Sequence, residues 1–295
     1  IYTRIMNPTS DVLEKRVAAM EGGIGALALA SGSAATTYAI MTICEAGDNI
    51  ISTSTLYGGT YTLFAHQLPR FGVDVKFGDH DDIPNLEKLI DKNTKAIFCE
   101  SIGNPAANVV DIPEIAKVAH KHKIPLIVDN TVPSPYLFRP IEHGADIVVH
   151  SLTKFIGGHG TVIGGCLVDG GNFDWTADPK RQPLFNEPDM SYGGAKWGEV
   201  VPQLTGANVS FAVRARVCLL RDLGAPLAPD NAWGIIQGLE TAPLRMKQHC
   251  SNAEKVVDFL TKHKNVERVI YPTLHKGAVG DRTKKYFSGG NGALI

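Results

Sequence analysis

The sequence predicts an α/β fold: a mainly parallel sheet of the seven-stranded type with helices on both faces, followed by the start of a smaller α+β domain. Short apolar runs alternate with helical stretches along the first half of the chain, an order typical of parallel strands joined by helices. Several of these runs are apolar throughout, as expected of strands covered on both faces. Polar residues follow the runs, at the edge where such sheets bind ligands.

The strands of the predicted sheet are the apolar runs at 26–30, 49–52, 73–77, 95–99, 124–128, 146–149 and 162–168. The helices before and between them are predicted at 11–21, 34–45, 59–70, 84–91 and 111–122. The first helix begins at Asp11, a residue type that caps helix N-termini well.

The second half of the chain departs from this alternation. Residues 170–195 are rich in Gly, Pro, Asp and aromatic residues, and so long a loop in a compact domain is usually functional or an entrance lid. The chain is predicted to be mostly helical over 209–263, with a strand at 266–270. We expect a major domain over 1–225 and the beginning of a C-terminal domain over 226–295, with both ends cut from a longer chain.

Composition argues against several classes of function. Lys plus Arg number 29 against 30 Asp plus Glu, so no basic surface for nucleic acid or membrane is expected. No apolar run approaches the roughly 20 residues that span a bilayer. The five cysteines are scattered without CxxC spacing, which favours a reduced, cytoplasmic protein. The histidines show no metal-ligand spacing, and no metal site is predicted.

Lys154 is the first candidate for chemistry. It follows a predicted buried strand directly and precedes a glycine-rich turn, within His150-Ser-Leu-Thr-Lys154 and Gly157-Gly-His-Gly160. An amine at a strand end can be partly desolvated, which frees it to form a Schiff base. Ser151 and Thr153 place hydroxyls on the same turn, suited to a phosphate. A surface lysine in a flexible turn is the alternative.

Asp129 ends the predicted strand 124–128, at the start of Asp129-Asn130-Thr131. A carboxylate there could pair with a protonated ring nitrogen and keep a pyridinium charged. An ordinary turn or cap Asp is the commoner alternative. Asp129 and Lys154 are separated by one strand–helix–strand step, which places both at one edge of the sheet and favours the functional interpretation.

Weaker signals surround these two residues. Gly32 and Ser33 lie between a predicted strand and a predicted helix, and helix N-termini favour phosphate, although most such turns are only turns. Tyr57 precedes a Gly pair and could stack on a flat ring or pack in the core. Asn104 could hydrogen-bond a ligand oxygen or simply form an Asn-Pro turn.

The N-terminal residues Tyr2 and Arg4 lie in Tyr-Thr-Arg-Ile-Met-Asn-Pro-Thr, with no element to hold them. Arg4 could pair with a phosphate through its planar guanidinium. A solvated surface arginine is the interpretation that the residues alone favour.

Together these residues resemble the Cys/Met-metabolism family of pyridoxal-phosphate (PLP) enzymes, of the aspartate-aminotransferase fold type I. The resemblance runs along nearly the whole chain. Its most specific part is Asp129-Asn130-Thr131 followed by His150 to Lys154 and Gly157 to His159, which looks like the family's cofactor-lysine signature. The opening Tyr2 to Thr9 also matches.

The resemblance implies roles for these residues in binding PLP. Lys154 would hold the cofactor as a Schiff base and move protons, Asp129 would pair with the pyridine nitrogen, and Tyr57 would stack on the ring. The phosphate would be bound by Gly32, Ser33, Ser151 and Thr153, and Asn104 would lie near the ring hydroxyl. Tyr2 and Arg4 would reach the phosphate of a neighbouring subunit, which implies at least a dimer and usually a homotetramer.

Within the family, three stretches resemble the O-acetylhomoserine sulfhydrylase branch, which makes homocysteine and acetate from O-acetylhomoserine and sulfide in methionine and cysteine biosynthesis. They are 100–112, 139–146 and the extra loop 173–192. Methionine γ-lyases typically carry Cys where Gly59 stands. The arginine that normally binds the substrate carboxylate would lie past Ile295.

Other functions remain open on the sequence. Cystathionine γ-synthase, a transsulfuration enzyme of the same family, uses the same intermediate but accepts cysteine, and a γ- or β-lyase is the next alternative. A non-catalytic scaffold belongs to another class, and the intact set of Tyr57, Asp129 and Lys154 argues against it. A nicotinamide-binding fold is disfavoured because no GxGxxG follows the first strand.

Overall fold

The structure, a computed structural model, describes residues 1–295 and is built on one seven-stranded sheet. The strand order is β1-β7-β6-β5-β4-β2-β3. Only β7 runs opposite to the rest, because it pairs antiparallel with both β1 and β6. The strands are β1 (Gly25–Leu29), β2 (Asn49–Thr53), β3 (Asp74–Gly78), β4 (Thr94–Glu100), β5 (Leu126–Asp129), β6 (Ile147–Ser151) and β7 (Gly165–Asp169).

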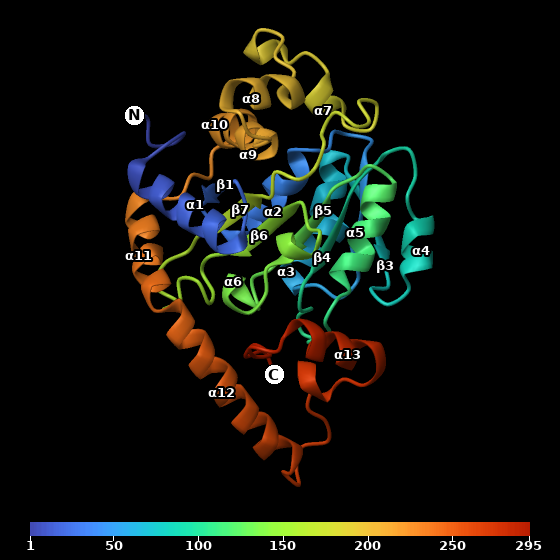
Figure 1. The fold of residues 1–295 in the computed structure, drawn as a ribbon, viewed down its shortest axis with the longest axis vertical. Coiled ribbons are helices and arrows are strands. Elements are labelled where there is room, and N and C mark those ends of the chain that lie inside the picture. The colour runs from blue at the N-terminus through green and yellow to red at the C-terminus, as the bar shows by residue number, and fades with distance from the viewer.

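Thirteen α-helices accompany the sheet (Figure 1). They are α1 (Pro8–Glu21), α2 (Gly32–Met41), α3 (Gly58–Thr62), α4 (Ile83–Lys88), α5 (Ile112–Lys121), α6 (Ser134–Leu137), α7 (Pro183–Asn186), α8 (Trp197–Thr205), α9 (Ser210–Arg214), α10 (Arg221–Leu223), α11 (Pro229–Glu240), α12 (Ala242–Thr261) and α13 (Gly277–Tyr286). None of them is both long and apolar enough to cross a membrane.

The side chains of each strand alternate between two apolar cores, one on each face of the sheet. On one face, Val128 and Val148 pack with residues of α1, α5 and α11. On the other, Ile127 and Val149 pack with residues of α2, α8 and α9. This two-sided burial is why the strands are apolar throughout, and it confirms the predicted α/β architecture.

The predicted elements of the main sheet are present, with differences at their ends. The first helix begins at Pro8 and is capped by Asn7, not by Asp11, because the Asn7 side chain accepts a hydrogen bond from the Thr9 amide at 2.9 Å. The second helix begins at Gly32 rather than 34, because Ser31 caps it by accepting a hydrogen bond from the Ala34 amide at 3.1 Å. The predicted helix 59–70 is three short pieces: α3, a π-helical turn over Leu63–Gln67 and a 3₁₀ turn over Leu68–Phe71.

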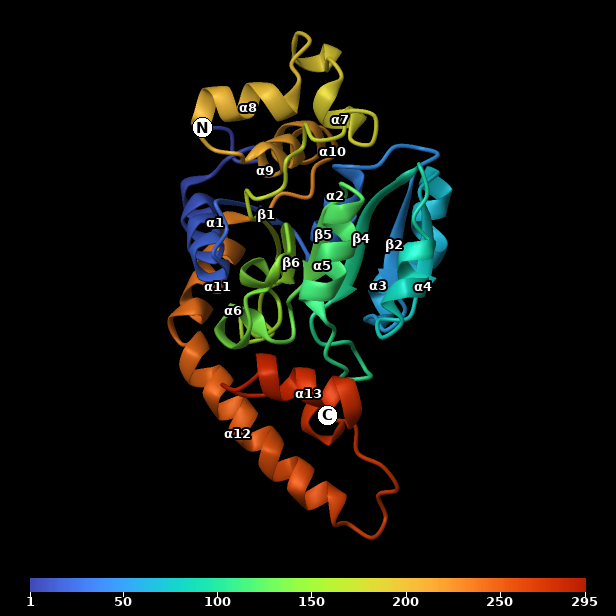
Figure 2. The same ribbon diagram turned by 45° about the vertical axis from the view of Figure 1, so that its right-hand side comes forward.

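Two expectations from the sequence were wrong. Residues 266–270 form no strand, because no other strand lies beside them to supply hydrogen-bond partners. The 170–195 segment is not a lid over the cavity described below: Phe173, Trp175 and Phe185 are buried in the core, and the Trp175 and Phe185 rings stack at 3.9 Å. Figure 2 shows α7, within this segment, at the end of the molecule opposite α13.

The chain leaves the main body along α12 and returns as α13 beneath the sheet (Figures 1 and 2). Leu227, Ala232, Ile235 and Leu239 still belong to the core shared with α1. A separate small cluster is formed by Ala253, Val257 and Tyr271. The division into domains at 225/226 stays a prediction.

Candidate active site

One cavity of about 710 Å³ opens at the carboxyl edge of the sheet. Its walls come from the loops after β1, β2, β4, β5 and β6 and from the C-terminal segment, which contributes Ala293 and Leu294. Eight of the ten predicted site residues line this cavity: Gly32, Ser33, Tyr57, Asn104, Asp129, Ser151, Thr153 and Lys154. Parallel strands bring these distant residues together because they end at one edge.

Lys154 lies on the turn after β6, with its side chain exposed to the cavity. Backbone hydrogen bonds hold the turn: the Gly158 amide donates to the Lys154 carbonyl at 2.7 Å, and the Gly157 amide donates to Leu152 at 2.8 Å. Arg245, on α12, donates to the carbonyls of Phe155 and Ile156 at 2.7 and 3.1 Å. The backbone around the lysine is therefore fixed from both sides.

Asp129 ends β5 and is half-buried, with its exposed part in the cavity. One of its oxygens accepts a hydrogen bond from the Thr131 amide at 2.9 Å, which orients the carboxyl group. Burial is the largest cause of its shifted acidity and raises the pKa of Asp129. A cationic group placed in the cavity would stabilise this carboxylate.

The N-terminus of α2 faces the same cavity beside β6. A Cβ atom built on Gly32 would lie 2.6 Å from Cβ and 2.9 Å from Cα of Ser151, so only glycine allows the helix to begin so close to the strand. The first amides of this ten-residue helix and the nearby hydroxyl of Ser151 offer hydrogen-bond donors to an anion.

Thr153 lines the cavity, but its hydroxyl already has partners. It donates to the Gly164 carbonyl at 3.2 Å and accepts from the Gly164 amide at 3.1 Å. In this arrangement Thr153 ties the lysine turn to the loop before β7. Its role toward a phosphate remains a prediction.

Tyr57 and Asn104 lie on two neighbouring loops, and the side chain of Glu100 hydrogen-bonds to both loops. Tyr57 directly precedes α3, at the end of the loop after β2, and is half exposed to the cavity. The Glu100 carboxyl group accepts hydrogen bonds from the amides of Tyr57 at 2.7 Å and Asn104 at 3.2 Å. Burial, followed by the nearby Asp129 carboxylate, raises the pKa of Glu100.

Tyr2 and Arg4 do not join this cavity. Tyr2 is exposed, and Arg4 donates to the Tyr2 hydroxyl at 3.2 Å. The segment is anchored elsewhere, since Arg216 donates to the Ile5 carbonyl at 2.8 Å. Their predicted role concerns a neighbouring subunit, and it stays a prediction.

Reasoning from single residues missed several residues of the cavity. Glu100 is the most important, and its signal was present: a carboxylate that directly follows the buried run Ala96 to Cys99, as Asp129 follows Leu126 to Val128. Four others come from helices or turns where no local pattern marks them: Thr36, Phe155, Ile163 and His249. Gly59 and Thr131 also line the cavity, and they lie within stretches that the sequence had already singled out.

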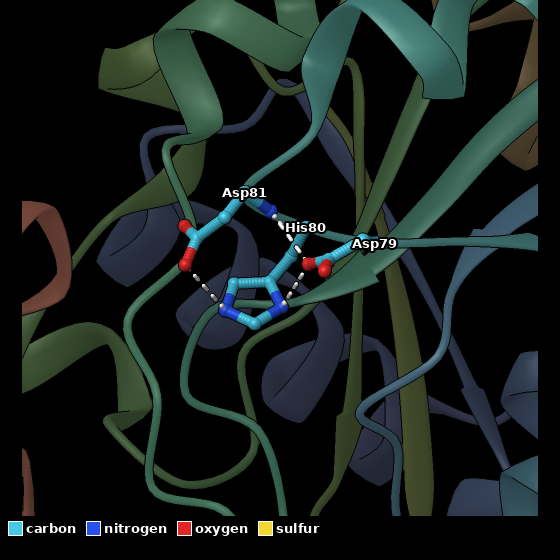
Figure 3. Close-up of side chains that lie close together, drawn as sticks. All are labelled: Asp79, His80 and Asp81. Carbon is cyan, nitrogen blue, oxygen red and sulfur yellow. Dashed lines mark hydrogen bonds and ion pairs between the residues drawn. The ribbon is translucent and has the colours of Figure 1, made fainter.

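Asp79, His80 and Asp81 bring two carboxylates and an imidazole together after β3, as Figure 3 shows. The Asp81 carboxylate already binds the guanidinium of Arg282, which is buried. The positive charge of Arg282 opposes a cation at the same place. We therefore assign this cluster to the attachment of α13 and not to a metal.

The open sheet, with a lysine, a carboxylate and a helix N-terminus converging on one cavity, defines the fold type I class of PLP-dependent enzymes. The chain belongs to the Cys/Met metabolism PLP-dependent enzyme family, whose sequence pattern matches residues 1–295.

Relatives and solved structures agree with this assignment. The chain is 51% identical to an O-acetyl-L-homoserine sulfhydrylase of Leptospira meyeri, over 100% of this chain and 67% of that protein. It is 50% identical to a homocysteine synthase of Schizosaccharomyces pombe, over 100% of this chain and 68% of the relative. A crystal structure of a putative O-acetylhomoserine (thiol)-lyase from Campylobacter jejuni, with N′-pyridoxyl-lysine-5′-monophosphate, superposes with a TM-score of 0.94 at 44% identity, covering 99% of this chain and 72% of that one.

The residues of the cavity fit PLP, the cofactor of this family. A phosphate matches the amides at the start of α2. There the close approach of Ser151 leaves no room for a side chain at position 32. A protonated pyridine nitrogen matches the half-buried carboxylate of Asp129, and an aldehyde matches the amine of Lys154. These three groups occupy one cavity, as binding of a single cofactor molecule requires.

Proposed function

We propose that this protein converts O-acetyl-L-homoserine and sulfide to L-homocysteine and acetate. The observation that carries the proposal is the 51% identity, across the whole of this chain, with a protein named for that reaction. When bound, PLP supplies the sink for the electrons released at the substrate's α-carbon. The remaining work falls to side chains of the cavity.

Lys154 is proposed to hold the cofactor covalently and then to move protons. Once the substrate amine has displaced it, the freed amine would take the proton from the α-carbon and pass that proton on before it takes a second one from the β-carbon. Acetate would leave the γ-carbon with its bonding electrons, sulfide would add there, and the two protons would return to the β- and α-carbons. Both positions require a base close to the cofactor. The exposed position of the Lys154 amine, on a turn held by Arg245, supports this assignment.

Asp129 is proposed to keep the pyridine nitrogen protonated, and Tyr57 to stack on the ring and act as a further acid or base. Gly32, Ser33, Ser151 and Thr153 are proposed to bind the phosphate, with Asn104 near the ring hydroxyl. Their common position around one cavity supports these assignments.

We infer that the active unit is at least a dimer, with a homotetramer as the expected assembly. The support is that Tyr2 and Arg4 lie outside their own chain's cavity, where they are accessible to a neighbouring subunit. A cytoplasmic location is proposed from the five free cysteines.

The nearest rival is cystathionine γ-synthase, which differs in accepting cysteine in place of sulfide. A dedicated methionine γ-lyase is disfavoured by Gly59, which stands where such lyases typically carry Cys. A Cβ atom at Gly59 would lie 2.5 Å from the Tyr57 ring, so a cysteine there would require the ring to move. A non-catalytic scaffold is disfavoured by the complete set of Lys154, Asp129 and Tyr57 around the cavity.

The test is a competition between the two sulfur donors. The full chain and PLP are incubated with O-acetylhomoserine and equal concentrations of sulfide and cysteine, and the products are identified by mass. Mostly homocysteine is expected. Mostly cystathionine would keep the family and the cofactor but assign the enzyme to transsulfuration, whereas release of an oxoacid and ammonia without a new thioether or thiol would indicate a lyase.

A further inference from the structure

Two loops that form one wall of the cavity are tied together by a single buried side chain. The loop after β2 carries Tyr57, and the turn after β4 carries Asn104. Glu100 is 4% exposed and spans the two, accepting from the Tyr57 amide at 2.7 Å with one oxygen and from the Asn104 amide at 3.2 Å with the other. No other side chain hydrogen-bonds both of these amides.

The same two loops contact each other at a second place. The Asn108 amide group donates to the Thr55 hydroxyl at 3.1 Å, and a Cβ atom on Gly103 would lie 3.1 Å from the Thr55 carbonyl oxygen. The turn after β4 continues toward the C-terminal segment (Figure 2), where His275 bonds the Ala106 carbonyl at 3.0 Å. The β4 turn is therefore held closely, and Glu100 connects it to the loop of Tyr57.

Glu100 also lies next to the carboxylate that faces the cavity. Glu100 and Asp129 are partners in the parallel pair β4–β5, so their side chains project from the same side of the sheet. Neighbouring strands are about 4.8 Å apart. A buried acid beside another acid is unfavourable unless hydrogen bonds hold it, and the two backbone amides do so here.

We propose that Glu100 is a positioning residue of the cofactor site, which sets Tyr57 and Asn104 at a fixed separation across the bound ring through their backbone amides. Glu100 acts through these two residues and not by contact with the reacting atoms. The inference rests on the cofactor roles proposed for Tyr57 and Asn104.

Two substitutions distinguish a role for the length of the Glu100 side chain from a role for its negative charge. Glu100→Gln keeps the length but removes the charge and one of the two acceptors. Glu100→Asp keeps the charge but is shorter by one methylene, about 1.5 Å, and withdraws from both amides. A positioning role predicts that E100D is more damaging than E100Q, whereas a role for the negative charge alone predicts the reverse order.

The measurement is the dissociation constant of PLP, obtained by titrating the apoprotein of the full chain, together with the induced circular dichroism of the bound cofactor. We expect the dissociation constant to rise about tenfold in E100Q, and further in E100D, because one and then both hydrogen bonds are lost. The dichroism should change with the orientation of the Tyr57 ring. Unfolding of each apoprotein is measured in parallel.

Asp146→Asn is the matched control. Asp146 is as deeply buried as Glu100 and accepts from the Leu126 amide at 2.8 Å, but it lies before β6 at the opposite edge of the sheet. We expect D146N to lower stability while the PLP dissociation constant stays within about twofold of the wild-type value. Equal losses of cofactor affinity in D146N and the Glu100 variants would reduce Glu100 to a general structural role.

The effect of E100Q in a Tyr57→Ala background tests whether Glu100 acts through Tyr57. If Glu100 acts partly through the Tyr57 ring, E100Q weakens PLP binding less in this background than in the wild-type chain. Equal effects in both backgrounds, or the order E100Q worse than E100D, would overturn the inference. If Y57A and N104A both leave PLP binding unchanged, the proposed site assignment fails instead, so the two failures are distinguishable.

Discussion

At the scale of single residues, the cavity is organised around one amine and one carboxylate. Asp129 ends β5, Lys154 lies on the turn after the adjacent strand β6, and both side chains line the same cavity. The Thr131 amide orients the Asp129 carboxylate, and backbone hydrogen bonds hold the turn that carries Lys154. A single ligand in this cavity can therefore meet both groups.

Replacing Lys154 tests the most specific assignment. Lys154→Ala should lose at least about 1000-fold in turnover, because it removes both the proposed covalent anchor and the proposed base. After borohydride reduction, the wild-type chain should retain the cofactor mass and K154A should not. Lys180→Ala, at an exposed position in the 170–195 segment, is the control expected to behave as wild type. An active K154A enzyme would contradict the assignment.

At the scale of elements, α12 is connected to the lysine turn by one side chain. Arg245 donates to three carbonyls, those of Phe155, Ile156 and Gly238. A Cβ atom on Gly158 would lie 2.1 Å from this guanidinium, so the turn is built around it. The helix that leaves the main body therefore also supports the backbone on which Lys154 stands.

Arg245→Met should retain much of the packing but lose all of these hydrogen bonds. We expect turnover to fall about 10- to 100-fold, since the position of the base is less well defined while its chemistry is unchanged. Steady-state rates for R245M are compared with those for Lys247→Met, an exposed change on the same helix. Identical rates in the two variants would show that the lysine turn keeps its conformation without Arg245.

A buried carboxylate at the end of β7 predicts the pH dependence of stability. Asp169 accepts from the amides of Gly171 and Ala212, and burial, the largest cause, raises its pKa to about 7. The folded chain therefore holds a proton that the unfolded chain loses near pH 4. This contribution of Asp169 to the free energy of unfolding is fully present below pH 4. It falls by up to roughly 4 kcal/mol as the pH rises toward 7.

Asp169→Asn should remove this contribution. Urea unfolding at pH 5 and pH 7.5 is expected to show a smaller fall in unfolding free energy in D169N than in the wild-type chain. Asp174→Asn, an exposed aspartate that also accepts a backbone hydrogen bond, should retain the wild-type difference. The same pH difference in D169N and wild type would mean that Asp169 is ionised throughout this range.

At the scale of the whole molecule, the cavity of one chain contains eight predicted site residues but neither Tyr2 nor Arg4. If these two complete the site of a neighbouring subunit, defects at Arg4 and at Lys154 lie in different chains of one active site. A hybrid of the two variants then contains one site with both defects and one with neither.

Co-expression of Arg4→Ala with Lys154→Ala should restore activity that neither variant has alone. About a quarter of the sites are intact if dimers assemble at random. The control is K154A with Asp129→Ala, because both residues lie in the same cavity and no hybrid site is intact. Failure of the first pair to recover more activity than the second would argue that each site is built from one chain.

Short-range patterns were sufficient to predict the sheet, because a strand covered on both faces must be apolar along its whole length. They also singled out Lys154 and Asp129, since polar residues directly after such strands are conspicuous. They were insufficient at 266–270, where a strand needs a partner, and at 170–195, where Trp175 and Phe185 are core residues rather than parts of a lid.

The sequence by itself determined the α/β class, the family and the lysine and carboxylate of the cavity, because these depend on local periodicity and on motifs a few residues long. Only the tertiary structure showed Glu100 bridging Tyr57 and Asn104, Arg245 supporting the lysine turn, and Thr153 engaged with Gly164. These contacts depend on side-chain directions and on which loops lie side by side. No local pattern encodes them, because each joins segments that meet only when the sheet is assembled.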